Sequence, residues 1–595
     1  MINKLCKELE NGFKRRQKKV RSERRDFLLS TAKIATVGAL TGWLPLARIR
    51  AAQAATSSVP AHFPPGISLY KQTFRNWAGD IKVDDIWTCS PLSPDDVVQI
   101  ANWAKDNAYK IRPRGMMHNW SPFSIAADVE FPAVVMLDMT AHLTAVSIDQ
   151  SGPTPQVTAQ TGITMEALLM ALENAGLGMT ATPAPGDITL GGVLAIDGHG
   201  TGVPAKGEKP LAGGTYGSVA NLILALTAVV YDDDSRSYVL REFVRSDPEI
   251  AALLVHIGRA FIVEVTLQVS QNQRLRCQSW FNIPATELFG PVASSGRSFS
   301  NFLDSAGRVE AIWFPFTSKP WVKVWTVSPN KPFLSRLTTQ PFNYTFSDNI
   351  PDSVSELTYK IVTLGQGGMT PSYGNVQYAA ASAGLVTTVS WDLWGWSKNL
   401  LLYVRPTTLH VTANGYAVLT KRENVQRVIN EFTTFYQKRL AAYQQMHRFP
   451  MNGPVEIRVT GLDNPNDVPS SNGVSPILSA LRPRPDRPEW DTAVWLDILT
   501  FPGTPYANRF YREIEQWINA NYSGSYASVR PEWSKGWGYS DQSAWSDPLA
   551  LQTTVPNTFR VGQSSASNWD TAKAGLSKHD PYRIFSSALH DSLSI

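Results

Sequence analysis

The stretch Gly186-Asp-Ile-Thr-Leu-Gly-Gly-Val-Leu-Ala-Ile-Asp-Gly-His-Gly-Thr-Gly202 is dense in glycine around the apolar run from Val193 to Ile196. Glycine lets backbone amides approach a ligand closely and adopt positive φ, which suits a bound diphosphate. A pair of tight turns around a buried strand fits the pattern equally well. The stretch is not a Rossmann fingerprint, because no Gly-x-Gly-x-x-Gly opens a helix in it and no acid follows at the expected spacing.

Short helices and strands alternate upstream of this stretch. Ser93 has the properties of a helix N-cap, with Pro94 at the first helical position, and the helix is predicted to run through Lys105. We expect strands at 110–112, 133–137 and 156–158, and a helix from Thr164 to Gly176. This order is typical of an α+β fold rather than of one long doubly wound sheet.

The length and the charge bound the class of protein. A chain of 595 residues exceeds what one core usually organises, so we expect two domains behind a leader. The formal charge of +5 comes from residues 1–54, which contain 13 Lys and Arg against four Asp and Glu. The rest of the chain is mildly acidic, which removes the support for a nucleic-acid partner.

The leader has three parts, which are a basic region that ends in Ser22-Glu-Arg-Arg-Asp-Phe-Leu28, an apolar run from Ile34 to Leu46, and small residues at Ala51–Ala55. This order is typical of a twin-arginine signal peptide over residues 1–54, cleaved after Ala54. The alternative is a basic tail before a short core helix. A signal of this type carries folded proteins, so we expect a secreted or periplasmic protein that loads a cofactor before export.

Cysteine and histidine are sparse. Beyond the leader the chain has only Cys89 and Cys277, which leaves room for one disulfide but not for a disulfide scaffold. The sequence has no Cys-x-x-Cys or His-Glu-x-x-His motif, and its nine histidines are scattered. We therefore predict no metal site.

Tryptophan, phenylalanine and tyrosine become frequent from about Cys277 onward, where we place a domain boundary. One long amphipathic helix, with Val425 through Tyr443 on one face, is expected to cover a sheet. The predicted domains are a cofactor domain at 58–275, a substrate-binding cap at 276–540, and a segment at 541–595 that returns to the cofactor domain.

The loop Arg114-Gly-Met-Met-His-Asn-Trp120 follows a predicted strand and presents a single histidine, His118, near Gly115. The backbone there can approach a ligand while the imidazole points outward. For a lone histidine, a hydrogen-bonded core residue is the alternative interpretation.

This loop, the Thr182-to-Gly192 stretch, the Gly198-His-Gly-Thr-Gly202 stretch and Ser218–Asn221 together resemble the PCMH-type FAD-binding domain of the vanillyl-alcohol oxidase family. From residue 60 onward the chain is similar to the covalent-flavin (type II) cholesterol oxidases of that family. The resemblance implies FAD between two α+β subdomains, a covalent bond from His118 to the flavin 8α-methyl group, and a cap with a large, mostly antiparallel sheet and flanking helices. The cofactor residues that it implies are Arg114, Gly115, Met116, Met117, His118, Asn119, Trp120, Ser121, Pro185, Gly186, Asp187, Thr189, Gly192, Gly198, His199, Gly200, Gly202, Ser218, Asn221 and Ile262.

Catalytic candidates lie in the cap. Glu456 and Arg458 alternate with apolar residues and share one face of a predicted strand, so they are either a surface ion pair or the Glu-x-Arg pair that borders the flavin in the sterol oxidases. Glu310 shares a strand face with Ile312 and Phe314, where its charged form is disfavoured, unless it reaches solvent at a strand end. By resemblance Lys535 lies near the flavin; a plain surface lysine is the alternative.

The resemblance implies oxidation of a sterol 3-hydroxyl, with hydride transfer to flavin N5 and with dioxygen reduced to hydrogen peroxide. Glu456 is the first choice for the base and Glu310 the second; Glu310 also suits the movement of the steroid double bond from position 5 to position 4. Arg458 would stabilise negative charge. The expected partners are sterol and dioxygen, with transient contact to a lipid surface, no nucleic acid, and a monomeric state.

Two rival functions remain open. One is a covalent-flavin oxidase of the same fold that acts on a sugar, an alditol or a phenolic alcohol, although few Asp, Asn and Gln residues cluster near Glu456. The other is a secreted carbohydrate-binding protein that uses its tryptophans as stacking platforms. The second leaves the glycine-rich segments without an explanation.

Overall fold

The computed structural model describes residues 59–126, 134–291, 296–345, 352–406 and 408–595. The predicted signal peptide at 1–54 lies outside the described residues. Within the described residues, no helix is long and apolar enough to span a membrane.

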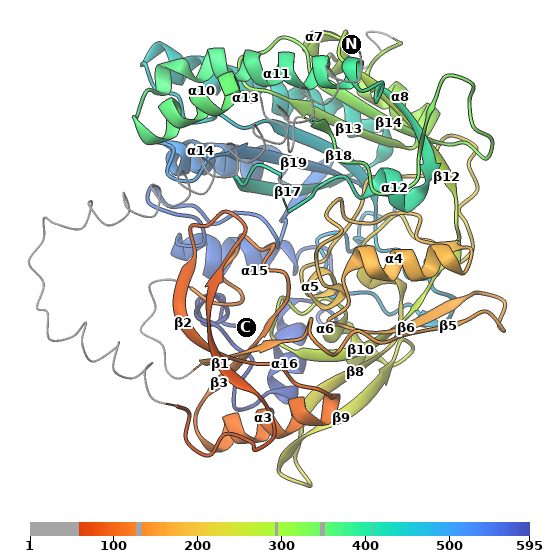
Figure 1. The fold of residues 1–595 in the computed structure, drawn as a ribbon, viewed down its shortest axis with the longest axis vertical. Helices are drawn as coiled ribbons and strands as arrows, with labels where there is room; N and C mark the ends of the chain where they lie inside the picture. The colour runs from red at the N-terminus through yellow and green to blue at the C-terminus, as the bar shows by residue number, and fades with distance from the viewer. Residues whose placement is uncertain (1–58, 127–133, 292–295, 346–351, 407) are drawn as a thin grey trace, which may run out of the picture. The chain divides into compact units, whose positions relative to one another are not determined.

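Two small sheets build the amino-terminal half (Figure 1). The first has the order β1-β2-β4-β3, with β1 (Leu69–Arg75), β2 (Lys82–Cys89), β4 (Val134–Asp138) and β3 (Lys110–Arg114). The second has the order β5-β6-β10-β8-β9, with β5 (Val146–Asp149), β6 (Gln156–Gln160), β10 (Phe261–Gln268), β8 (Ile223–Asp232) and β9 (Ser237–Val244). A short pair, β7 (Leu177–Gly178) and β11 (Ser270–Gln271), completes this half.

A nine-stranded sheet builds the other half. Its strands in spatial order are β15 (Arg336–Thr338), β16 (Asp392–Trp396), β12 (Arg274–Trp280), β14 (Trp321–Val327), β13 (Arg308–Trp313), β18 (Val455–Gly461), β19 (Thr492–Thr500), β17 (Thr412–Thr420) and β20 (Ala527–Pro531). All neighbours pair antiparallel except β15 and β16. The predicted α+β class with a large, mostly antiparallel sheet is therefore confirmed.

Helices cover the outer side of this sheet (Figure 1). These are α8 (Phe299–Ala306), α10 (Asp352–Thr363), α11 (Thr370–Thr387), α13 (Val425–Gln445) and α14 (Ala507–Asn521). Helix α13 confirms the predicted amphipathic helix, since its buried residues include Phe432 and Tyr436, and Tyr436 packs 5.9 Å from Trp313 of β13. The amphipathic pattern here marks a structural element, as predicted.

The predicted helix starts in the cofactor half are confirmed. Helix α3 (Pro94–Asp106) begins at Ser93, whose hydroxyl accepts a hydrogen bond from Asp96 N–H, and α4 (Met165–Asn174) begins at Thr164, which caps Ala167 N–H. These side chains satisfy backbone donors that a helix leaves without partners in its first turn. Both helices end within two residues of the predicted positions.

The buried strand weighed for Val193–Ile196 is wrong. These residues form α5 (Leu190–Ala195) and its C-cap, and Thr189 caps the helix by accepting from Gly192 N–H. Two consecutive glycines and the short length disfavour a helix here, but the threonine cap and the burial of Leu190, Val193 and Leu194 in the main core stabilise it. The glycine-rich stretch therefore opens a helix after all.

The cysteines do not form the disulfide that the sequence left open. Cys89 lies in β2 and Cys277 in β12, and both are free, buried thiols. Burial raises the pKa of each thiol to about 12, so neither is a reactive thiolate at neutral pH. Within the described residues, no cluster of His, Cys, Asp and Glu has the grouping of a metal site.

Residues near 580 contact the cofactor half. Asp580 accepts hydrogen bonds from Tyr238 of β9 and from Arg259, and Ile584 C=O accepts from Ile111 N–H of β3. The predicted domain boundaries at 275 and 540 remain predictions.

Candidate active site

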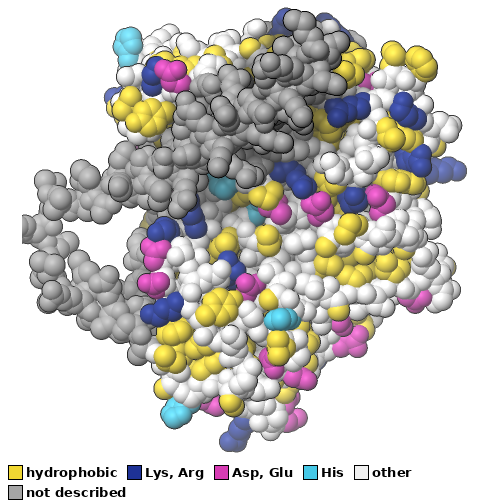
Figure 2. All heavy atoms as spheres, in the orientation of Figure 1, with side chains coloured by type: hydrophobic (Ala, Val, Ile, Leu, Met, Phe, Trp, Pro, Cys, Tyr) yellow, Lys and Arg dark blue, Asp and Glu magenta, His cyan; other side chains and the backbone are white. Residues whose placement is uncertain are grey.

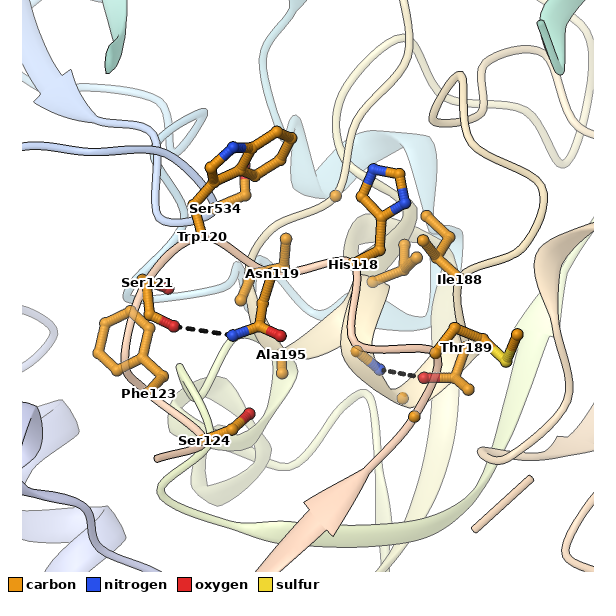
Figure 3. Close-up of a pocket in the computed structure, with 18 of the residues that line it drawn as sticks. His118, Asn119, Trp120, Ser121, Phe123, Ser124, Ile188, Thr189, Ala195 and Ser534 are labelled. Carbon is orange, nitrogen blue, oxygen red and sulfur yellow. Dashed lines mark hydrogen bonds between the residues drawn. The ribbon is translucent and has the colours of Figure 1, made fainter. Parts of the chain in front are cut away.

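A cavity of about 310 Å³ lies where the loop after β3 meets α5 and strand β18 of the large sheet. Figure 3 shows His118 to Ser121 of this loop beside Thr189 and Ala195. Most of the predicted cofactor residues line this cavity, together with three of the four catalytic candidates: Arg114, Gly115, Met116, Met117, His118, Asn119, Trp120, Ser121, Pro185, Thr189, Gly192, Gly198, His199, Ile262, Glu456, Arg458 and Lys535. Residues more than 400 positions apart in the sequence thus form one site.

Other predicted cofactor residues support the walls instead of lining the cavity. Ser218 donates to Asp463, Asn221 donates to the Asn464 carbonyl, and Gly202 exchanges backbone hydrogen bonds with β18. Gly186, Asp187 and Gly200 are also absent from the lining. For example, a Cβ at Gly200 would lie 2.6 Å from Thr182 N, so this glycine permits close packing of two loops.

The loop that carries His118 is held in a specific shape. Met117 has φ of 57°, a left-handed conformation, and a Cβ at Gly115 would lie 2.5 Å from Thr189 Oγ1. Asn119 donates to the Ser121 carbonyl across the turn (Figure 3). The loop can therefore approach the start of α5 only because residue 115 has no side chain.

The His118 imidazole lies at one end of a stack of three aromatic rings. Its ring stacks on Trp77 at 3.8 Å with an interplanar angle of 21°, and Trp77 stacks in turn on His410 at 4.0 Å. Burial lowers the pKa of His118 to about 3, with smaller contributions from Lys535 and His410. The ring is therefore neutral at neutral pH, and its buried Nδ1 has no hydrogen-bond partner. A hydrogen-bonded core histidine, the alternative interpretation, does not describe this environment.

The cavity fits FAD by its donor and acceptor set. Besides His118 Nδ1, the buried atoms without a hydrogen-bond partner among its lining residues include Arg114 Nε, Asp197 Oδ1 and Glu532 Oε2. Unsatisfied buried polar atoms are costly, so a polar ligand at this position would compensate them. When bound, FAD would be held by the loop of residues 114–121, by α5 and by the segment of residues 197–199.

Glu456 and Arg458 project from β18 toward the cavity and form an ion pair of 3.6 Å. Arg458 also donates to the fully buried Asp497 of β19. Burial raises the pKa of Glu456, partly offset by Arg458, whereas Asp497 and Glu456 outweigh burial and raise the pKa of Arg458. The side chains of Arg458 and Glu456 are 13% and 21% exposed and both border the cavity, so they are not a freely exposed surface pair.

Glu310 on β13 differs from the sequence expectation. Its carboxylate is 1% exposed, accepts hydrogen bonds from Lys323 Nζ at 3.1 Å and from Tyr403 Oη at 2.7 Å, and lies 3.8 Å from Arg458. Burial raises the pKa of Glu310, but Lys323 and Arg458 lower it more, so the net pKa lies below its usual value. The expectations of a disfavoured charge or of a solvent-exposed strand end are both wrong, because the register pairs Glu310 opposite Lys323.

Lys535 is 9% exposed, with its ammonium 4.2 Å from the Trp120 ring centroid, so it is not a plain surface lysine. It lies beside a second acid pair that the sequence analysis missed, Asp497 and Glu532. A Cβ at Gly415 would lie 2.7 Å from an oxygen of each of these acids and 2.7 Å from Lys535 Cγ. The bare glycine of β17 therefore leaves room for both carboxyls.

Glu532 also connects the large sheet to the glycine-rich segment. Its Oε1 lies 3.6 Å from His199 Nε2, and the His199 ring stacks on Trp495 of β19 at 3.6 Å. Burial raises the pKa of Glu532, but Lys535 and His199 lower it far more. His199 is thus positioned by the substrate half, as a neighbour of the cofactor site.

Several lining residues had no recognisable sequence signal. Trp77 and Glu532 are isolated side chains without a motif, and their roles come from contacts with residues far along the chain. Asp197 could have been found, because it is the second acid of the glycine-rich stretch and directly precedes Gly198.

Two family models match this chain, one in each half of the structure. Residues 88–209 match the family model "FAD binding domain", and residues 274–594 match the model "Cholesterol oxidase, substrate-binding". L-gulonolactone oxidases from Scyliorhinus torazame and Mus musculus are 25% identical over 41% of this chain. The chain spans about half the length of these two relatives.

Solved structures match over almost the whole described chain. A solvent-stable cholesterol oxidase is 70% identical, with a TM-score of 0.90, and the match covers 90% of this chain and 100% of that one. A cholesterol oxidase from B. sterolicum is 43% identical, with a TM-score of 0.88, over 90% of this chain and 99% of that one.

The fold and the cavity define a flavoprotein oxidoreductase that has an FAD-binding domain and a separate substrate-binding domain. The chain belongs to the family of FAD-dependent cholesterol oxidases, whose cofactor domain is of the vanillyl-alcohol oxidase type. The resemblance inferred from the two glycine-rich stretches is thereby confirmed.

Proposed function

We propose that this protein oxidises the 3-hydroxyl group of cholesterol or a related sterol to a 3-ketosteroid, with dioxygen as acceptor and hydrogen peroxide as product. The observation that carries the proposal is the meeting of Glu456 and Arg458 with His118 in one cavity. When bound, FAD supplies hydride acceptance and reoxidation by dioxygen. The chain's own residues orient the alcohol, exclude water and move its proton.

Glu456 takes the hydroxyl proton in this proposal. Its burial raises its pKa and hence its basicity, and it borders the cavity. Arg458, held by Asp497 on the opposite side, keeps a fixed positive charge beside the substrate oxygen, where negative charge develops as the proton leaves.

Glu310 serves the double-bond shift from position 5 to position 4. It is a carboxylate beside Arg458, one strand away from Glu456. Its hydrogen bonds to Tyr403 and Lys323 hold it in the charged form that abstraction of a carbon-bound proton requires.

The FAD is bound covalently through His118 in this proposal. The bond to the flavin 8α carbon would replace one C–H bond of the methyl group and the imidazole N–H bond; both protons would leave, and two electrons would pass to the flavin ring, which dioxygen would reoxidise. The pKa of about 3 keeps His118 in the neutral form that this bond requires. Its buried Nδ1 atom has no hydrogen-bond partner among the described residues, which supports this nitrogen as the one that forms the bond.

The covalent bond and the sterol substrate can both be tested on one purified preparation. After acid precipitation, yellow colour in the pellet supports the His118 bond, whereas colour in the supernatant removes that bond but leaves FAD binding intact. Incubation with cholesterol and dioxygen should give peroxide and a conjugated 4-ene-3-one steroid in equal amounts. Oxidation of L-gulonolactone or an alditol in preference to cholesterol would overturn the sterol assignment.

The protein reaches a secreted or periplasmic location by the twin-arginine route in this proposal. The support is the sequence of residues 1–54 and the need to fold around FAD before export. Replacing Arg24 and Arg25 with lysine in the producing cell should retain the full-length protein in the cytoplasm. Unchanged export would remove the twin-arginine assignment.

A further inference from the structure

A second cavity, of about 250 Å³, is lined by residues of α14, of β20 and of α15 (Val555–Thr558). No residue lines both this cavity and the cofactor cavity. The second cavity is smaller than the roughly 300–1,000 Å³ that is usual for drug-sized ligands, so its size fits a small molecule.

One segment of the chain borders both cavities. Pro531 and Trp537 line the second cavity, whereas Glu532 and Lys535, which lie between them in the sequence, line the cofactor cavity. The second cavity is therefore adjacent to the cofactor cavity but separate from it, and the proposed oxidation of a sterol uses none of its lining residues.

Arg530 of β20 brings a buried positive charge to the second cavity. Its side chain is 1% exposed, its Nε and Nη1 donate to backbone carbonyls such as those of Thr558 and Arg482, and its Nη2 has no hydrogen-bond partner among the described residues. Burial, followed by the charges of Arg482 and Arg484, lowers the pKa of Arg530 to about 9, so it stays charged at neutral pH. A buried cation without a charged partner is unfavourable, and a bound anion would stabilise it.

Other basic side chains have acidic neighbours. On the face drawn in Figure 2, basic side chains lie beside acidic ones in several places. Arg512 of α14, which also lines the second cavity, lies 3.2 Å from Asp541 and 4.0 Å from Asp547. Arg530 differs from these, because no described acid lies within ion-pair distance of its guanidinium group.

Trp537 supplies a second unpartnered donor to the same cavity. Its side chain is fully buried, and its indole Nε1–H has no hydrogen-bond partner within the described part of the chain. Arg512 Nε is a third such donor, and among the lining residues that the structure describes no buried acceptor is unpartnered. Because buried polar atoms are nearly always hydrogen-bonded, these three donors indicate a ligand that has acceptor atoms.

Glu515 of α14 lines this cavity too, but the fold already uses its oxygens. Its Oε2 accepts from the Tyr416 hydroxyl and from Gly538 N–H, and its Oε1 accepts from Tyr539 N–H. Burial raises the pKa of Glu515 to about 7, so at neutral pH this side chain carries only part of a negative charge. Glu515 therefore leaves the charge of Arg530 available to another acid.

Apolar side chains line another part of the cavity. Val529, Ala550 and Val555 are buried, and Leu549 is 67% exposed, so the cavity opens to solvent beside it. Residues Ala550–Thr554 form a π-helix, which is rare in proteins and is frequent at functional sites. A ligand that complements this wall has an apolar part next to its acceptor group.

We propose that the second cavity binds a small monocarboxylate with a short apolar chain, and that Arg530 Nη2 and Trp537 Nε1 donate to its carboxylate. A carboxylate has two acceptor oxygens and makes strong, charge-assisted hydrogen bonds with a guanidinium group. The proposal goes beyond the proposed function, because this ligand is neither the sterol nor FAD.

Isothermal titration calorimetry of the holoenzyme with sodium hexanoate tests the site. The control probes are 1-hexanol, which has the chain without the charge, and sodium sulfate, which has the charge without the chain. Hexanoate should bind at one site per chain and at least about tenfold more tightly than either control probe, because only hexanoate supplies both parts.

Trp537→Phe keeps the aromatic ring and removes only an N–H that no described residue uses. It should weaken hexanoate binding by about tenfold, because a hydrogen bond to a charged group is lost. Trp545→Phe is the matched control, since Trp545 Nε1 is also buried without a partner in the described structure but Trp545 does not line the cavity. It should bind hexanoate as the wild type does.

Two arginine variants complete the test. Arg530→Gln should weaken hexanoate binding by more than about tenfold, because the charge itself is lost. If this variant does not fold, since Arg530 also donates to backbone carbonyls, Trp537→Phe decides. Arg458→Ala, in the cofactor cavity, should bind hexanoate as the wild type does.

Three outcomes would overturn the second site: no binding of hexanoate to the wild type, equal affinities in Trp537→Phe and Trp545→Phe, or a loss of affinity in Arg458→Ala but not in Trp537→Phe. The last outcome would place the carboxylate in the cofactor cavity. Sulfate bound as tightly as hexanoate would overturn the assignment of a carboxylate with an apolar chain. None of these outcomes depends on turnover of cholesterol, so failure of the proposed sterol chemistry is distinguished from failure of this site.

Discussion

Asp197 and Asp463 share one hydroxyl group, that of Ser479, whose Oγ lies 2.9 Å from Asp197 Oδ2 and 2.6 Å from Asp463 Oδ2. Ser479 can donate to only one of the two carboxyls, and its oxygen already accepts from Leu481 N–H. Asp463 also accepts two hydrogen bonds from Ser218, which favours its charged form. Asp197 accepts from Ser479 and from Ala480 N–H, and its burial beside the charge of Asp463 raises its pKa, so Asp197 is the carboxyl that holds a proton at neutral pH.

This arrangement predicts a dependence of stability on pH. Burial, followed by the charge of Asp463, raises the pKa of Asp197 to about 8, far above its value of 3.8 in the unfolded chain. Between these values the folded state holds a proton that the unfolded state has lost. The free energy of unfolding should therefore fall as pH rises from about 4 to about 8, by about 1.4 kcal/mol per pH unit at most from this group.

The substitution Asp197→Asn should make the free energy of unfolding less dependent on pH, because an amide is neutral at every pH. Urea unfolding of the holoenzyme at a series of pH values measures this dependence. Asp463→Asn is the contrasting variant, since it places an amide where three donors converge and should destabilise the protein at all pH values. An unaltered pH profile in Asp197→Asn would contradict the protonated state of Asp197.

Arg458→Ala should reduce peroxide formation from cholesterol by about 10²–10³-fold, because it removes the fixed positive charge beside the substrate oxygen. The flavin absorption spectrum should stay, since none of the contacts described for His118 involves Arg458. Arg458→Lys keeps the charge but loses the planar guanidinium group that donates to Asp497. It should therefore recover only part of the rate. Unchanged turnover in Arg458→Ala would exclude this residue from the mechanism.

Glu310→Gln should destabilise the protein by about 3–5 kcal/mol in urea unfolding, because it leaves the ammonium of Lys323 buried without a charged partner. The double variant Glu310→Gln/Lys323→Met should recover most of that loss. Glu356→Gln is a control, since Glu356 pairs with Lys360 on an exposed face of α10 and its removal should cost less than about 0.5 kcal/mol. Equal effects of the two single variants would contradict a buried pair.

Trp77→Ala should lower the fraction of FAD that stays with acid-precipitated protein, because the indole orients the imidazole of His118 by stacking. FAD should still bind without the covalent bond and appear in the supernatant. Trp280→Ala is the control, since this partly exposed indole lies in the substrate half. Complete covalent retention in Trp77→Ala would show that the stack is not required for the bond.

Patterns within a few residues predicted much of the fold. The cap at Ser93, the cap at Thr164 and the stripe of α13 are local signals, and the structure has the predicted elements at each. The run Val193–Ile196 misled because apolar runs of four residues do not distinguish a buried strand from a buried helical turn. Here the N-cap at Thr189 favours the helix, and Thr189 lies outside the apolar run.

The residues of the candidate site also divide into those that the sequence could predict and those that it could not. His118, Glu456 and Arg458 could be predicted because each lies in a motif that the family resemblance carries. Asp497 and Glu532 could not be, because their proximity depends on the pairing of β17 with β19 and β20 and on the missing side chain of Gly415. The electrostatics of Glu310 depended on register, which a single strand's sequence does not encode.

The contacts of Asp580 and Ile584 with β9 and β3 have a consequence for the order of assembly. Strand β3 leads into the loop that carries His118, yet it is completed by residues that lie more than 450 positions later in the chain. A ribosome that has made only the amino-terminal half has not yet made the segment that closes this sheet. We therefore expect flavin incorporation to follow release of the whole chain, with folding slowed by the large sequence separation of these contacts.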